Sequence, residues 1–418
     1  DANGVRTFTY TVSDGHGGAA TATATVNIAP VAAAPVIGAG AEPLAFVTLA
    51  DTLVSTSGGG AEAVASIASN GSGSAVVWTG NSLNNAIYLQ RLDSAGSPLG
   101  ATVTVTATNG ETPSITELAN GDLLVTWSLG QSAIMARRFS ASGDPLGAQF
   151  QINSDGVGNH RSPSIVATPD GGYLIAWWAG NDKAYLARFG AEDTPIVPQL
   201  QVNTTPVSES AVRVALLPDG GYLVTYATIG VSGFDIFAQR FNADHTFRDG
   251  EVRLNATTAG NQFWPYTAGL GDGGYVVAWG SFGQDGSGYG IFAQRFSADG
   301  DPVGGEFLVT TTTADFQIQP MVVALEDGGF VVSWASNGQD GSGYGLYARR
   351  YDADGAALGG EARLNATTAN DQRIDTNSGG SHLIISPDGV ITQVFVSNET
   401  SGGVYVRQFE AVAPIAAV

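Results

Sequence analysis

The stretch EDGGFVVSWASNGQDGSGYGLYARRYDADGAALGGEARLNATTANDQ, from Glu326 to Gln372, decides the fold because the chain repeats it. The stretch before it, GDGGYVVAWGSFGQDGSGYGIFAQRFSADGDPVGGEFLVTTTTADFQ, occupies residues 271–317 and follows the same pattern. Seven copies of this unit fill the chain from about residue 44 to its end. Repeats of roughly 40–50 residues that each hold several short strands are typical of β-propellers.

An aromatic residue near the end of the second strand of each unit sets the register of the repeat. It recurs as Trp78, Trp127, Trp177, Tyr226, Trp279, Trp334 and Phe395, with spacings of 49, 50, 49, 53, 55 and 61 residues. Short β-branched and aromatic runs alternate with Asp-Gly turns, and no stretch keeps a helical period. The sequence therefore predicts an all-β fold, a seven-bladed β-propeller of four-stranded antiparallel blades.

The two ends of the repeat region complete each other. After VYVRQF, which ends at Phe409, the last unit has no fourth strand, whereas LAFVTLA at residues 44–50 directly precedes the first unit. We expect this N-terminal strand to close the ring, because closure limits exposed strand edges. The predicted domains are a β-hairpin fragment over residues 1–29, an Ala/Pro/Gly linker over 30–43 and the propeller over 44–418.

Charge and composition restrict the partners. With 17 basic and 38 acidic residues the formal net charge is −21, so we expect no binding to nucleic acid and an attraction for cations. There is no cysteine, which excludes disulfides and thiolate metal sites. We find neither an apolar run of 18 residues nor a signal-peptide pattern, so we expect no membrane insertion. Because the chain begins within the strand-like stretch TFTYTV, we expect it to be part of a longer protein.

Two stretches resemble known families. The hairpin, through TFTYTVSDGHGG, resembles the closing strands of the cadherin-like and VCBS-type domains of large bacterial surface proteins. The repeat DGGFVVSW…QDGSGYGLYARRYDADGAALGGEARLN is similar to the propeller-type repeats of giant RTX-type, calcium-dependent secreted proteins and adhesins. This resemblance implies an extracellular or cell-surface location, adhesive or ligand-binding roles and calcium dependence. The chain lacks the GGxGxDxUx nonapeptide array, so the calcium-binding mechanism of that array does not carry over.

One face of the predicted ring differs from the other. Loops one–two and three–four are tight turns of nearly uniform length, whereas loops two–three and four–one vary, and variable loops on a rigid scaffold commonly bind ligands. Aromatic rings stack on sugars and polar groups bind hydroxyls, so we expect a glycan or another surface ligand on the variable face. The candidate ligand-binding residues are Asn261, Trp264, Tyr289, Phe316, Tyr344 and Arg373. The alternative is that Trp264 and Phe316 pack between blades.

Three acidic residues are candidate metal ligands. Asp285 and Asp340 open identical DGSGYG loops, and Asp235 occupies a related place. A carboxylate followed by flexible backbone carbonyls could hold Ca²⁺, which prefers oxygen ligands. The alternative is that these loops are compact turns in which the Asp caps backbone amides.

A recurring arginine of the third strand precedes an apolar residue in most units, and we interpret it as structural. We expect it to lie between blades and to pair with the Glu of the following strand, at Glu251, Glu306 or Glu361.

Catalysis has little support in the motifs. The four histidines fall in different units or outside the ring, and no GxSxG, HExxH or phosphate-binding loop is present. The predicted inner strands offer Glu117 and few other polar groups.

We therefore expect an extracellular binding or adhesion module rather than an enzyme. One alternative is an assembly subunit in which residues 1–29 pair with another copy by strand addition. A second is a polysaccharide-active hydrolase or lyase, which carboxylates near the channel mouth would favour.

Overall fold

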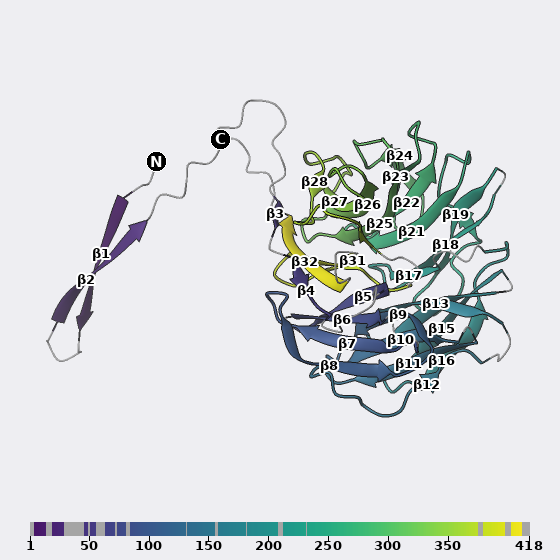
Figure 1. Ribbon diagram of the computed structural model, residues 1–418, viewed down its shortest axis with the longest axis horizontal. Helices are drawn as coiled ribbons and strands as arrows, with labels where there is room; N and C mark the ends of the chain where they lie inside the picture. The colour runs from purple at the N-terminus through teal and green to yellow at the C-terminus, as the bar shows by residue number, and fades with distance from the viewer. Residues whose placement is uncertain are drawn as a thin grey trace. The chain divides into compact units, whose positions relative to one another are not determined.

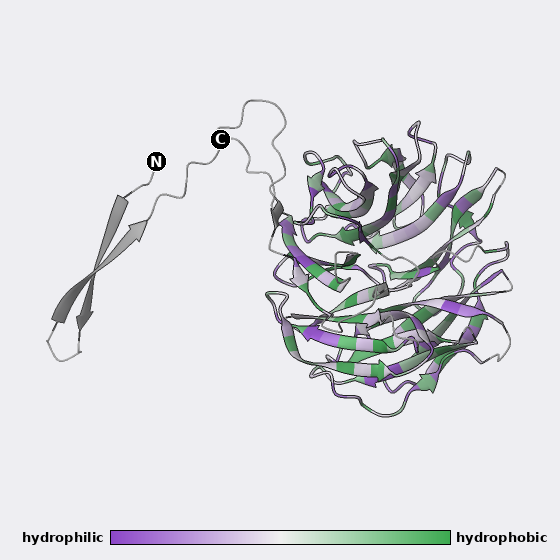
Figure 2. Cartoon of the chain, in the orientation of Figure 1, coloured by the Kyte–Doolittle hydropathy of each residue, from purple (hydrophilic) through white to green (hydrophobic). Residues whose placement is uncertain are grey.

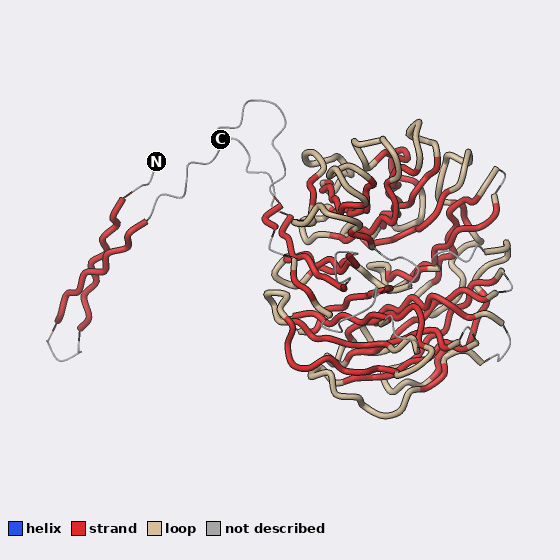
Figure 3. Tube along the Cα trace, viewed as in Figure 1, coloured by secondary structure: helices blue, strands red, loops and turns tan. Residues whose placement is uncertain are grey.

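The computed structural model describes most of the chain, and this part is built of strands, turns and loops without a helix (Figure 3). The described residues are 4–13, 19–28, 46–48, 51–55, 63–71, 73–80, 84–130, 132–154, 158–180, 182–207, 212–230, 232–374, 379–397 and 403–411. The chain divides into two compact units, Asp1–Glu42 and Pro43–Val418. No described segment is a helix capable of crossing a membrane.

The N-terminal unit contains one hairpin. Strands β1 (Gly4–Ser13) and β2 (Ala19–Ile28) pair antiparallel from Gly4 opposite Ile28 to Ser13 opposite Ala19. The predicted linker over 30–43 lies outside the described residues. Strand addition by the hairpin to another copy stays a prediction, which concentration-dependent polymerisation lost on deleting residues 1–29 would support.

The second unit is a ring of antiparallel sheets around a common centre, and it confirms the predicted seven-bladed β-propeller (Figure 1). Blade 1 holds β5 (Ala63–Asn70), β6 (Gly73–Thr79), β7 (Ile87–Leu92) and β8 (Pro98–Thr106). Blade 2 holds β9 (Gly110–Glu117), β10 (Leu123–Leu129), β11 (Ala133–Phe139) and β12 (Phe150–Gln151). Blade 3 holds β13 (His160–Ala167), β14 (Tyr173–Ala179), β15 (Lys183–Phe189) and β16 (Pro195–Gln201). Blade 4 holds β17 (Arg213–Leu216), β18 (Tyr222–Ile229), β19 (Phe234–Phe241) and β20 (Val252–Arg253).

The remaining blades follow the same order, from the inner first strand to the outer fourth strand. Blade 5 holds β21 (Gln262–Gly269), β22 (Tyr275–Phe282), β23 (Tyr289–Phe296) and β24 (Pro302–Leu308). Blade 6 holds β25 (Gln317–Ala324), β26 (Phe330–Asn337), β27 (Tyr344–Tyr351) and β28 (Ala362–Arg363). Blade 7 holds β29 (Gln372–Arg373), β30 (Leu383–Ile385), β31 (Val390–Ser397), β32 (Gly403–Ala411), β3 (Phe46–Thr48) and β4 (Thr52–Leu53).

The second strands form the core of the ring, because neighbouring blades cover both of their faces. Hydrophobic residues recur along the strands of the ring (Figure 2), and in β14 every residue is buried. The aromatic landmarks lie here, and Trp127, Trp177 and Trp279 are fully buried. Each hairpin to the second strand turns at a glycine with positive φ, such as Gly273 at +90°, which explains the repeated Asp-Gly.

Blade 7 closes the ring with strands from both ends of the chain, as predicted. Strand β3 pairs with β32 from Phe46 opposite Ala411 to Thr48 opposite Phe409, and β4 extends the pairing beyond residue 50. Asp51, between these two short strands, forms an ion pair with Arg407 at 3.1 Å. Arg407 is buried, so closure also satisfies a charge inside the blade.

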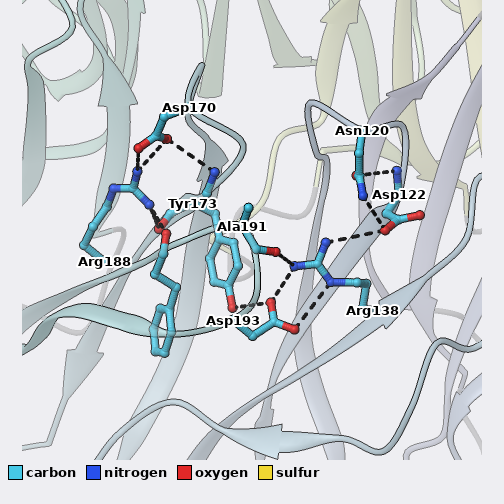
Figure 4. Close-up of polar contacts among 10 residues, drawn as sticks. Asn120, Asp122, Arg138, Asp170, Tyr173, Arg188, Ala191 and Asp193 are labelled. Atoms are coloured by element: carbon cyan, nitrogen blue, oxygen red, sulfur yellow. Dashed lines mark hydrogen bonds and ion pairs between the residues drawn. The ribbon is translucent and has the colours of Figure 1, made fainter.

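The predicted partners of the third-strand arginines are wrong. Arg188 binds Asp170 of the one–two turn in its own blade at 2.6 Å, and Arg295 binds Asp272 in the same way at 2.9 Å. Figure 4 shows the Arg188 pair beside Arg138, which instead reaches Asp193 of the next blade at 2.6 Å. The Asp-Gly turn folds back over the end of its own third strand, so its carboxylate is closer than the Glu of the fourth strand.

The acidic residues of the fourth strands bind the loops of neighbouring blades. Glu306 of blade 5 accepts a hydrogen bond at 2.8 Å from the Ala256 N–H, which follows blade 4. Asp51 of blade 7 accepts the equivalent bond from the Ala366 N–H at 2.9 Å. Glu251 and Glu361 take the same role at the next seams. These bonds fix the starts of the four–one loops, and the candidate ligand residues Asn261 and Phe316 lie at the ends of two such loops.

Candidate functional site

The inner strands of the ring surround a central pocket of about 500 Å³. Residues from β5, β9, β13, β17, β21, β25 and β30 line it, mostly through small apolar side chains. Its lining reaches the last residues of these strands, such as Glu117, Leu216 and Gly269, so the pocket extends to the end of the ring that carries the one–two turns.

One layer of the inner strands is asymmetric, and its members Ser164, Arg213 and Tyr266 line the pocket. The layer is formed by the first-strand residue that pairs with the second-strand residue just before the aromatic landmark. This first-strand residue is Ser66 in blade 1, Ser114 in blade 2 and Ser164 in blade 3. The same register places Arg213 there in blade 4 and Tyr266 in blade 5. Three blades therefore contribute small hydroxyls, whereas two adjacent blades contribute a guanidinium and a phenol.

A short segment of blade 7, residues 379–381, closes the other side of this layer, and we call it the strap. A side chain on Gly380 would begin 2.3 Å from Ser66 Oγ, and one on Gly379 would begin 2.3 Å from the Pro163 carbonyl oxygen. The Ser381 carbonyl accepts a hydrogen bond from the Ile67 N–H at 2.8 Å. The strap thus crosses from blade 7 to blades 1 and 3, and only glycine permits so close an approach.

The phenol of the pocket is tied to the strap, because Tyr266 Oη donates to Ser381 Oγ at 2.9 Å. Burial raises the pKa of Tyr266, while the hydrogen bond with Ser381 and the charge of Arg213 act in the opposite direction. The phenol therefore keeps its proton at neutral pH. In this structure the phenol donates that proton to Ser381.

The guanidinium of the pocket is almost fully buried, with 5% of Arg213 exposed. Burial lowers the pKa of Arg213 to about 10, and the neighbouring Tyr266 opposes that shift. Arg213 therefore stays protonated at neutral pH and adds a positive charge to the lining of the pocket. A buried guanidinium favours carboxylate or sulfate ligands, because charge-assisted hydrogen bonds to them are strong.

Glu117 lies at the open end of the pocket. Its carboxylate accepts a hydrogen bond at 2.9 Å from the Gly71 N–H of blade 1. It is the one carboxylate among the described residues that line the pocket. A glycosidase of the usual kind needs two carboxylates, so the described lining does not provide that pair.

A second candidate surface lies on the face of the two–three and four–one loops, between blades 4, 5 and 6. We call it the aromatic cluster, and its members are Phe234, Phe263, Trp264, Phe282, Tyr289 and Phe316. The ring centroids of Trp264 and Tyr289 are 5.0 Å apart, and those of Phe282 and Tyr289 are 5.1 Å apart. Phe282 is 46% exposed and Phe316 is 41% exposed, so this cluster presents aromatic surface to solvent.

The structure brings four of the predicted ligand residues together here. Asn261 hydrogen-bonds to the Tyr289 hydroxyl and accepts the Phe234 N–H at 3.2 Å, and Trp264 and Phe316 flank the tyrosine. Trp264 is half-buried and has a φ of +57°. The matching residues Thr112, Ser162 and Gln319 also have positive φ, so this conformation belongs to a bulge of the inner strand rather than to a ligand site.

The other two predicted ligand residues lie at the next seam. The Arg373 guanidinium stands 4.6 Å from the centre of the Tyr344 ring and forms an ion pair with Asp371 at 2.9 Å. This pair is therefore not part of the aromatic cluster.

The three predicted metal ligands lie in three different blades. Asp235 Oδ1 accepts from the Asn255 amide at 2.7 Å, and Asp340 Oδ2 accepts from the Asn365 amide at 3.3 Å. Asp285 Oδ2 is buried with no hydrogen-bond partner among the described residues. The described residues contain no group of three or more His, Cys, Asp or Glu that could hold a metal ion together. Calcium binding at these residues stays a prediction.

Sequence reasoning missed Arg213 and Tyr266. Arg213 stands where the inner strands of blades 1, 2 and 3 have serine, and Tyr266 follows a Trp-Pro pair, so neither belongs to a recognised motif. A comparison of equivalent positions across the seven units would have marked both as the large polar exceptions in an inward-facing layer.

Comparison with known proteins identifies the fold alone. No family model matches the chain, and no curated protein matches it. An ulvan lyase of a new polysaccharide lyase family has a similar structure, with a TM-score of 0.55, 10% identity, and coverage of 87% of this chain and 95% of that one. A puromycin hydrolase has a TM-score of 0.53 and 14% identity, covering 83% of this chain and 52% of that one. A Dyadobacter fermentans protein of unknown function has a TM-score of 0.51 and 10% identity, covering 73% of this chain and 95% of that one.

These comparisons correct one expectation. We expected a binding module rather than an enzyme because no catalytic motif is present, but the proteins with a similar structure include lyases and a hydrolase. In this fold the absence of a linear motif is no evidence against catalysis, because blades far apart in sequence can each contribute one residue to the channel.

Proposed function

We propose that the chain is a polysaccharide lyase that cleaves a uronate-containing glycan by elimination in the central pocket. The observation that carries this proposal is that Arg213 and Tyr266, both buried, line one layer of the same pocket. The lyase with the similar structure was solved bound to -[GlcA(1-4)Rha3S]-, which is consistent with this class of substrate.

The reaction would use three residues in different roles. The Arg213 guanidinium pairs with the uronate carboxylate and stabilises the negative charge that develops there in the transition state. The Glu117 carboxylate accepts the proton from the ring carbon beside the uronate carboxylate. The Tyr266 phenol donates its proton to the leaving bridging oxygen.

The bonds balance without a further reactant. The carbon–hydrogen bond beside the carboxylate breaks, and its electron pair forms a double bond to the next ring carbon. The bond from that carbon to the bridging oxygen breaks, and the oxygen takes the phenolic proton. The proton on Glu117 can return to Tyr266 through water after the products leave.

The test is incubation of the purified chain with a panel of uronate-containing polysaccharides, ulvan among them. We expect an increase in ultraviolet absorbance from the new double bond, together with shorter chains. Tyr266→Phe and Arg213→Gln should lose this activity, whereas Met321→Leu, at the matching position of blade 6, should keep it. New reducing ends without the double bond would contradict elimination, and no product from any substrate would overturn the proposal.

A second candidate function is glycan binding on the aromatic cluster, and the exposure of Phe282 and Phe316 favours it. Rings of this kind stack on sugars, and the Asn261 side chain beside them can bind hydroxyls. This surface would hold a glycan chain at the other end of the ring from the pocket. A glycan array with wild type and Phe316→Ala tests it, and unchanged binding would place the glycan elsewhere. Both functions fit the expected extracellular location, which stays a proposal.

A further inference from the structure

An asparagine after the fourth strand is a repeated device of this ring. It is Asn153 in blade 2, Asn203 in blade 3, Asn255 in blade 4 and Asn365 in blade 6. In each case its Oδ1 accepts the N–H of a residue early in the third strand, at 2.7–2.8 Å. The side chain therefore ties the end of each of these blades to its own third strand.

In blades 4 and 6 the two N–H groups of this asparagine side chain are shared among three oxygens. Asn255 Nδ2 donates to Asp235 Oδ1 at 2.7 Å, to the Thr257 carbonyl at 2.8 Å and to Gln262 Oε1 at 3.3 Å. Asn365 Nδ2 donates to the equivalent set, Asp340 Oδ2 at 3.3 Å, the Thr367 carbonyl at 2.6 Å and Gln372 Oε1 at 3.0 Å.

The carboxylate of this set reaches its place by two routes. In blade 4 it belongs to Asp235 of β19, at the position that is Gly290 in β23 and Gly345 in β27. In blades 5 and 6 it comes from the two–three loop, because Asp285 Oδ2 and Asp340 Oδ2 lie 2.5 and 2.6 Å from where a Cβ on these glycines would stand. All three blades thus bring one carboxylate to the same spot.

Blade 5 keeps these oxygens but lacks the nitrogen. Thr310 replaces the asparagine, while Asp285 and Gln317 remain, and the Gln317 side chain is held by its Nε2–H bond to the Ala314 carbonyl at 2.6 Å. Asp285 Oδ2, Thr310 Oγ1 and Gln317 Oε1 are all buried without a hydrogen-bond partner among the described residues. Thr310 is 2% exposed and Gln317 is fully buried, so solvent at the surface does not satisfy them.

We propose that the seam between blades 5 and 6 binds one hard cation of calcium size in place of the missing amide nitrogen. Its ligands are Asp285 Oδ2, Thr310 Oγ1, Gln317 Oε1 and the Thr312 carbonyl, which matches the carbonyls of Thr257 and Thr367. Oxygen atoms of carboxylate, carbonyl and hydroxyl groups are the ligands that such a cation takes, with water completing its shell. The net charge of −21 raises the local concentration of cations around the chain.

The proposal separates three carboxylates that look alike in the sequence. Asp235 and Asp340 already bind an amide nitrogen, so they have no need of a cation. The sequence-based expectation assigned calcium to all three, whereas the present proposal expects one ion per chain, in blade 5.

The test uses the whole chain, calorimetric titration with CaCl₂ and thermal melting in chelator or with added CaCl₂, MgCl₂ or NaCl. We expect one calcium ion per chain and a melting temperature raised by about 2 °C or more at saturation. Thr310→Asn supplies the amide nitrogen itself, so it should melt higher than wild type in chelator and lose the calcium response.

The reciprocal change provides the matched control. Asn365→Thr empties the equivalent place beside Asp340 and Gln372, so we expect a second calcium ion in that variant. The double variant Thr310→Asn/Asn365→Thr should bind one ion again, now in blade 6. A calcium response that Thr310→Asn leaves unchanged would place the ion elsewhere. No binding of any of the three cations to wild type would mean that water fills the site, and either result would overturn the proposal.

Discussion

The two ends of the ring are built from the same repeat, yet they differ in where their asymmetry lies. At the end with the one–two turns, the turns themselves are uniform, and the difference between blades lies in one layer of the inner strands. In this layer Arg213 and Tyr266 take the place that serine has in blades 1, 2 and 3. At the other end, the loops themselves differ, and the aromatic cluster lies among them. A repeat protein can therefore build one site by varying its loops and another by changing single inward-facing residues.

The largest expected effect comes from a deletion that destabilises both ends of the ring together. Deleting residues 44–53 takes β3 and β4 from blade 7 and leaves the buried Arg407 without Asp51. Removing one partner of a buried ion pair costs about 3–5 kcal/mol, so we expect the melting temperature to fall by about 5–10 °C. Pocket activity and glycan binding should be lost on heating at the same temperature. A deletion variant that melts at the wild-type temperature would contradict the prediction that ring closure stabilises both ends of the ring.

The next prediction tests whether the functions at the two ends of the ring are independent of each other. Tyr266→Phe removes the proton donor of the pocket, and we expect elimination to slow about 100-fold or more. Glycan binding at the aromatic cluster should not change, because no member of the cluster lines the pocket. Loss of both functions in a variant that still melts as wild type would show that the two ends are coupled.

A third prediction concerns the strap between the two ends. Gly380→Ala places a methyl group against Ser66 Oγ, so we expect a loss of about 1–3 kcal/mol of unfolding free energy from overpacking. Ser66→Gly removes that oxygen and should restore part of the loss in the double variant, as denaturant titration would measure. Equal losses in Gly380→Ala with and without Ser66→Gly would exclude this contact as the cause.

Truncation of the exposed rings gives a smaller effect. Phe316→Ala and Phe282→Ala each remove one ring beside Tyr289, and we expect each to weaken glycan binding by about 1 kcal/mol. The rate of elimination on short substrates should stay at the wild-type value. Exposed Ile229, on the same face in blade 4, is the matched control, because Ile229→Ala removes apolar surface without removing a ring.

The smallest effect is a dependence of stability on pH at the loop end. Burial alone would raise the pKa of Glu251, but hydrogen bonds from Thr204, Thr205 and Tyr226 outweigh it and lower that pKa. A carboxylate with a lowered pKa in the folded state adds stability above its unfolded pKa, and this stability is lost as pH falls through the folded value. Glu251→Gln should therefore melt closer to wild type at acidic pH than at neutral pH. An equal difference at both pH values would contradict this role of the carboxylate.

The aromatic cluster shows how far sequence reasoning reaches in this chain. Asn261, Trp264, Tyr289 and Phe316 could be placed on one face because strands in a blade alternate in direction, so the loop type fixes the face. Their convergence within a few ångströms could not be predicted, because it depends on the packing of blades 4, 5 and 6. Tyr344 and Arg373 show the limit, since the same argument grouped them with residues of another seam.

The sequence by itself determined the number of blades, the four strands of each, and the closure of blade 7 by strands from both ends, because the repeat carries turn glycines and buried aromatics at fixed spacing. Only the tertiary structure decided which equivalent residues meet. Arg213 and Tyr266 share a pocket, Arg188 pairs with a turn aspartate, and Thr310 faces oxygens that an asparagine satisfies elsewhere. Local spacing encodes strands and turns, whereas contacts between blades depend on the closed ring, in which residues about 50 positions apart become neighbours.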